Sequence, residues 1–192
     1  KITKGMQSLE NTCFLHTEPH HDDIMLGYFA HIVRHFRKAS NRHHFLTFTS
    51  GFTSVTNHFM TDQVLNLGKF LSTDEFADLH KEGYFDPKDQ MARNRDVWQY
   101  LDGVAASNQD MKNEGCARRF LRILFDVYQV KSFNGIDKVL ANLLEYFQTQ
   151  YPGKHDPQDI QQIKGMCREW EAECLWGYYG WNCDNVSHLR LG

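Results

Sequence analysis

The chain has 192 residues, of which 41% are hydrophobic and 23% are charged, and its formal net charge is −3. This length and composition predict a soluble globular protein with one domain and room for an inserted subdomain. The charge balance offers no basic excess for nucleic acid, and no apolar run approaches the ~20 residues that cross a bilayer. We therefore expect no nucleic-acid partner and no membrane span.

The five cysteines predict free thiols. Their number is odd, their spacing is irregular, and no two of them form a C-x-x-C pair. This argues against a zinc ribbon and against a thioredoxin-type redox site. Cys167 and Cys174 stand seven residues apart in a predicted helix, which is typical of small buried side chains. We expect such a chain in a reducing compartment, the cytoplasm.

The first fifty residues predict a β-α-β unit. The segments 12–17 (TCFLHT) and 43–50 (HHFLTFTS) are β-type runs, and apolar residues recur at helical spacing over 22–38. A strand, a helix and a second strand in this order normally form a parallel pair with a right-handed crossover. The sequence therefore predicts a parallel sheet.

The rest of the chain predicts a helical block and one more strand. Residues 57–180 read almost entirely as helix, and 186–192 (VSHLRLG) predicts a third strand. The fold class is then α/β with a large helical insertion. A three-stranded sheet is a small core for this length, and the chain starts with Lys1, not methionine. We therefore expect a fragment or processed product, truncated at its C-terminus.

Four side chains that can bind metals follow the first predicted strand: His20, His21, Asp22 and Asp23. Ligands of α/β proteins collect beyond the carboxyl ends of parallel strands. An imidazole and a carboxylate there can bind a divalent metal, and a second carboxylate can act as general base on water. Aspartates at the start of a helix also cap it and offset its dipole. The spacing alone leaves both interpretations open.

The string PHHDDIMLG (19–27) resembles the A-H-P-D-D-E-x-x-L-G signature of the PIG-L/LmbE-like zinc-dependent de-N-acetylases. The segment HHFLTFTSG is similar to that family's second strand, and REWEAECLWG (168–177) is similar to its R-x-x-E helix. The resemblance covers about 10–55 and 160–192. It implies a Rossmann-like parallel sheet, Zn²⁺ as cofactor, and removal of an N-acetyl group from an amino sugar or its conjugate.

The resemblance also implies roles for single residues. His20 and Asp23 match zinc ligands, and Asp22 matches the general base. Arg168 matches the helix arginine, a substrate contact. His21 replaces the proline of the signature; we expect it to point toward solvent or substrate and do not count it as a ligand.

The sequence departs from the family pattern in two further places. Ile24 stands where the signature has glutamate, and the later H-P-D-H-type motif that supplies the third zinc ligand is missing. The nearest string, KHDPQD, precedes the R-x-x-E helix, and we expect its His155 to be exposed. For His188, in the third strand, we expect a core or surface role. These departures keep open a catalytically impaired LmbE-like module as an alternative.

The resemblance implies a division into regions. Residues 1–56 and 181–192 form the first part of the LmbE-type core, 57–155 the helical insertion, and 156–180 a core helix. The string HTEPHHDDIMLGY resembles bacterial proteins that fuse a glucosamine-6-phosphate deaminase-like domain to an LmbE-like domain. The implied partners are a small-molecule amino-sugar substrate and a covalently fused N-terminal enzyme domain; a homo-oligomer is left open.

Other polar and aromatic residues are interpreted as structural. His31 and His35 lie four residues apart without a glutamate between them, so we expect a solvated helix face. The runs RNRD (93–96) and ARR (117–119) predict charged helix faces. The aromatic residues of 170–181 predict core packing in preference to a sugar-binding platform.

Overall fold

The protein is a mixed α/β structure with a three-stranded parallel sheet. A computed structural model describes residues 2, 7–129, 133, 135–151 and 153–191. The strands are β1 (Cys13–Glu18), β2 (Arg42–Thr49) and β3 (Val186–Leu191), arranged in the order β1-β2-β3. The prediction of three parallel strands at these places is confirmed.

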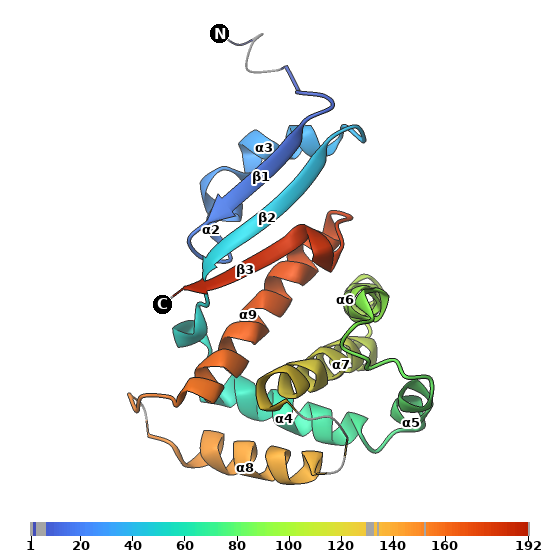
Figure 1. Ribbon diagram of the computed structural model, residues 1–192, viewed down its shortest axis with the longest axis vertical. Helices are drawn as coiled ribbons and strands as arrows, with labels where there is room; N and C mark the ends of the chain where they lie inside the picture. Colours follow the sequence, from blue (N-terminus) through green and yellow to red (C-terminus); the bar gives the residue numbers. More distant parts are fainter. Residues whose placement is uncertain (1, 3–6, 130–132, 134, 152, 192) are drawn as a thin grey trace.

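The helices follow the predicted order along the chain. They are α2 (Asp23–Gly27), α3 (Phe29–Phe36), α4 (Asn57–Phe70), α5 (Asp74–Lys81), α6 (Gln90–Ala105), α7 (Gln109–Tyr128), α8 (Ile136–Thr149) and α9 (Gln158–Tyr178), with short 3₁₀ turns η1 (Phe52–Ser54) and η2 (Cys183–Asn185). Figure 1 shows α9 running from the sheet into the group of helices formed by α4, α7 and α8. None of the described helices combines the length and apolarity that a bilayer crossing needs.

The single helix predicted over 22–38 is two helices, because the chain breaks at Tyr28. This residue has φ −146° and ψ 15°, outside the helical region. Gly27, which favours helices poorly, precedes the break. The Tyr28 hydroxyl donates to the Thr17 carbonyl at 3.3 Å, which holds the break against the end of β1.

The described helices cover one face of the sheet. His16 and Glu18 of β1 are buried on this face, and Phe45 of β2 stacks on Trp176 of α9 with ring centroids 3.7 Å apart. On the other face Leu15 is 64% exposed and Leu189 is 49% exposed. A Rossmann-like sheet carries helices on both faces, so that finer description stays a prediction.

Helix α9 contributes to three hydrophobic cores. Its middle, with Trp170 and Cys174, packs with Val97 of α6 and with Cys183. Its C-terminal half, with Trp176, packs against the sheet and α3. Its N-terminal half, with Ile163 and Cys167, packs with buried residues of α4, α7 and α8. The prediction that Cys167 and Cys174 are buried free thiols is confirmed. Core packing of the aromatic group is confirmed for Trp170 and Trp176, but it was wrong for Tyr178, which is 70% exposed at the end of the helix. The division into core and insertion at 57 and 155 stays a prediction.

The two runs predicted as charged helix faces, 93–96 and 117–119, are mostly buried, although Arg95 is exposed. Asp96 is 0% exposed and Arg119 is 3% exposed. The Arg122 Nε donates to Asp96 at 2.8 Å, and Arg119 pairs with Glu173 of α9. The prediction was wrong because charged residues on successive turns look alike in sequence, whether they face water or each other.

A group of buried imidazoles lies between the sheet and α3. His16 and His43 share a hydrogen bond of 2.9 Å between Nε2 and Nδ1, and their rings are nearly parallel. His35, which we predicted to be solvated, is 5% exposed and its Nδ1 accepts the Leu9 amide at 3.2 Å. Burial, followed by the neighbouring His43 and His35, lowers the pKa of His16 to about 4. The pKa values of His35 and His43 are lowered as well, mainly by burial.

These imidazoles predict a loss of stability in acid. Below the ordinary histidine pKa of ~6.5 the unfolded chain binds protons that the folded chain excludes, so the free energy of unfolding falls as the pH drops from about 6.5 toward 4. Urea denaturation at several pH values measures this fall. The His16→Phe variant should show a shallower fall, and the control His58→Phe, at an exposed position, should match the unmodified protein. An equal fall in His16→Phe would contradict the assignment.

Candidate active site

The turn between β1 and α2 is fixed to the end of β2. The Thr49 amide and the Thr49 hydroxyl both donate to the Pro19 carbonyl, at 3.0 Å and 2.7 Å. Because β1 and β2 are parallel, their carboxyl ends meet at this edge of the sheet. The predicted site residues 20–23 therefore lie where α/β proteins bind their ligands.

The buried carboxylate of Glu18 fixes the turn between β1 and α2 to the core. It is 1% exposed, and its two carboxylate oxygens accept the Thr47 hydroxyl at 2.9 Å and the Ile24 amide at 3.2 Å. Burial raises the pKa of Glu18, as do the nearby Asp23 and Asp22 carboxylates. Sequence analysis missed this residue, because the burial of His16, two residues earlier and therefore on the same face of the strand, is seen only in the structure.

His20 and Asp23 face each other on the surface of the turn. The His20 Nδ1 lies 3.4 Å from the Asp23 carboxylate, and the two side chains are 62% and 41% exposed. The same carboxylate accepts the His20 amide at 2.8 Å. Asp22, the N-cap residue of α2, is exposed and makes no capping hydrogen bond with its side chain. Its carboxylate is thus open to solvent, on the residue that directly precedes Asp23 in the chain.

His21 does not point to solvent, and that part of the prediction was wrong. Its side chain is buried, 5.5 Å from the ring of His188 between centroids, and none of the four ring nitrogens has a hydrogen-bond partner among the described residues. Burial, followed by His188 and Arg168, lowers the pKa of His21 to about 4. His21 is therefore neutral at physiological pH, and burial lowers the pKa of His188 as well. His155 is exposed, as predicted.

Arg168 lies near the turn but is paired within its own helix. Its guanidinium donates to Glu171 at 2.5 Å, so the arginine and glutamate of the R-x-x-E segment bind each other. Its Cγ lies near Gly51, the residue that also borders His21. The arginine thus reaches the carboxyl edge of the sheet from α9.

The turn fits part of a zinc site. An imidazole and a carboxylate are ligands that zinc takes in proteins, and a catalytic zinc normally has three protein ligands. His20 and Asp23 would supply two of these. Among the described residues, no group of three or more His, Cys, Asp and Glu side chains is placed to hold a metal ion. The third ligand of the expected set is therefore not among them.

Comparison with known proteins identifies no family for this chain. No protein-family model, no curated protein and no solved structure matches the chain.

Replacing Gly51 with alanine should lower the free energy of unfolding more than replacing Gly83, which has similar backbone angles. Gly51 has φ +65°, and a Cβ there would lie 3.3 Å from the His21 Nδ1; Gly83 has φ +74° and nothing within 4 Å of its Cβ position. Alanine at either place adopts the left-handed conformation at a cost of about 1–2 kcal/mol. Only Gly51→Ala also displaces His21, which should add roughly 1 kcal/mol. Equal losses of unfolding free energy for Gly51→Ala and Gly83→Ala, measured in urea, would show that the contact has no effect.

Proposed function

We propose that the protein is a metal-dependent hydrolase that removes an N-acetyl group from an amino sugar or its conjugate, on a Rossmann-like core. The observation that carries the proposal is the His20–Asp23 pair, 3.4 Å apart at the carboxyl edge of the sheet. The neighbouring residue in the chain, Asp22, is exposed and makes no capping hydrogen bond with its side chain. The resemblance of 19–27 to the de-N-acetylase signature supports the choice of reaction.

The residues of the turn would have separate roles in the reaction. His20 and Asp23 would hold zinc, which supplies a Lewis acid for the amide carbonyl when bound. Asp22 takes a proton from the attacking water and returns it to the leaving amine. Glu18 keeps these side chains in place through the Ile24 amide. A general base of this kind contributes roughly 10²–10⁴-fold to a rate.

Arg168 is proposed as a substrate contact and not as part of the proton transfer. Its side chain is 25% exposed, and its Nε has no partner among the described residues. A guanidinium in this place can donate to a sugar hydroxyl or to a phosphate group of a conjugate. His21 is buried and neutral, and it would pack beneath the site without contacting the substrate.

A second candidate has its own observation. Ile24 stands where the family signature has glutamate, and it is 0% exposed in the core with Phe45 and Trp176. Because residue 24 packs in the core here, the turn also fits a domain that has kept the fold and lost the hydrolytic activity. Such a module would be attached to a glucosamine-6-phosphate deaminase-like enzyme.

The Asp22→Asn variant tests the hydrolase. Amine release from N-acetylglucosamine by the intact protein with added zinc should fall by roughly 10²–10⁴-fold in this variant, because asparagine cannot accept the proton. Asp62→Asn, at an exposed position of α4, is the control and should leave the rate unchanged. Equal rates for Asp22→Asn and the unmodified protein would overturn the role of Asp22. Absence of hydrolysis in the unmodified protein would favour the module.

A further inference from the structure

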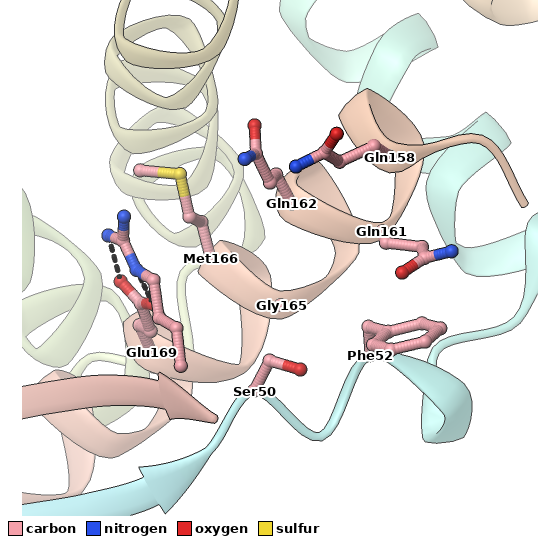
Figure 2. A pocket seen from close by; sticks show the side chains of 9 residues that line it. Ser50, Phe52, Gln158, Gln161, Gln162, Gly165, Met166 and Glu169 are labelled. Carbon is pink, nitrogen blue, oxygen red and sulfur yellow. Dashed lines mark hydrogen bonds and ion pairs between the residues drawn. The ribbon is translucent and has the colours of Figure 1, made fainter. Parts of the chain in front are cut away.

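A small pocket lies at the same edge of the sheet as the acidic turn. Its volume is about 170 Å³, and it is bordered by the end of β2, by η1 and by the N-terminal half of α9. Figure 2 shows Ser50 and Phe52 on one side of it and Gln158, Gln161 and Gln162 on the helix. Pockets for drug-sized ligands measure roughly 300–1,000 Å³, so this one has room for a single small ring.

The wall offers several hydrogen-bonding groups without a protein partner. The Ser50 hydroxyl and the carboxamides of Gln158 and Gln162 make no hydrogen bond to any described residue. The Gln161 carboxamide donates to the Asp156 carbonyl at 2.7 Å, which leaves its oxygen as an acceptor. Each carboxamide carries both donors and acceptors, as a hydroxyl does. The wall therefore suits a ligand that also donates and accepts at several positions.

The pocket has no net charge to attract an ion. Arg190 of β3 and Glu169 of α9 form a bidentate ion pair, with N–O distances of 2.6 Å and 2.9 Å. The positive charge of one therefore neutralises the negative charge of the other. These are the only charged residues that line the pocket among the described residues. Because the guanidinium is already bound to a carboxylate, an anion would have to displace Glu169, which is buried. A neutral polar ligand requires no such exchange.

Phe52 and Gly165 shape the pocket for a ring with one apolar face. The Phe52 ring borders the space, and an aromatic face packs well against C–H groups. A Cβ at Gly165 would lie 3.1 Å from the Ser50 Cβ, so glycine lets α9 approach the end of β2 closely. This close approach brings the helix and the end of β2 together on either side of the pocket.

We propose that this pocket binds one ring of a neutral polyhydroxylated ligand, a monosaccharide. The segment Ser50–Gly51–Phe52 separates it from the turn, since Gly51 borders His21 while Ser50 and Phe52 line the pocket. The inference deepens the proposed function, because a sugar is the proposed substrate class and the pocket would hold a ring beside the acidic turn. Binding itself depends on neither zinc nor Asp22.

The test measures sugar binding without catalysis. N-acetylglucosamine is titrated by calorimetry into the intact protein in EDTA. Saturable binding is expected, weakened at least tenfold in Gln158→Leu and in Gln162→Leu; both positions are exposed, so these variants should fold. Gln148→Leu, exposed on α8, is the control and should bind as the unmodified protein does.

Three results would overturn the proposal: no binding at millimolar sugar, binding that neither glutamine variant weakens, or binding of inorganic phosphate in preference to the sugar. The Asp22→Asn variant separates this proposal from the hydrolase. Sugar binding that persists in a protein without hydrolytic activity would support the pocket while the proposed function fails. Hydrolysis by a protein that binds no sugar in EDTA would support the proposed function and overturn the pocket.

Discussion

The buried carboxylate of Glu18 is the constraint on which the candidate site depends. A glutamate with 1% exposure needs partners for both oxygens, and it finds them in the Thr47 hydroxyl of β2 and the Ile24 amide of α2. This joins two strands and a helix at one point. The turn that carries His20 and Asp23 is therefore positioned by the core, although its own side chains are exposed.

Helix α9 reaches the same edge of the sheet, where Gly165 approaches Ser50. The helix carries Trp176 into the sheet core and Glu173 into the buried ion pairs with Arg119. Breaking a buried pair leaves an uncompensated charge, which typically costs about 3–5 kcal/mol. The ion pairs thus fix how the helical block packs on α9. The N-terminal half of the same helix carries Gln158 and Gln162 of the pocket.

Local patterns predicted the elements well, and tertiary contacts account for what they missed. Alternation and helical spacing located the three strands and the helical block, and strand-then-helix order placed His20 to Asp23 at the sheet edge. The break at Tyr28 depends on a hydroxyl contact with β1. The burial of Arg119 depends on partners 23 and 54 residues away in the chain, Asp96 and Glu173. No local pattern contains such distant pairs, and the same holds for Glu18 and Thr47.

The central proposal is that this edge, set by Glu18, would hold a divalent ion between His20 and Asp23. It is tested most directly by the zinc content of the intact protein after equilibration with zinc and removal of unbound metal. The account predicts one zinc per chain, lost in His20→Ala and kept in His31→Ala, since His31 is also exposed but lies on α3. Equal zinc content in His20→Ala and the unmodified protein would contradict it.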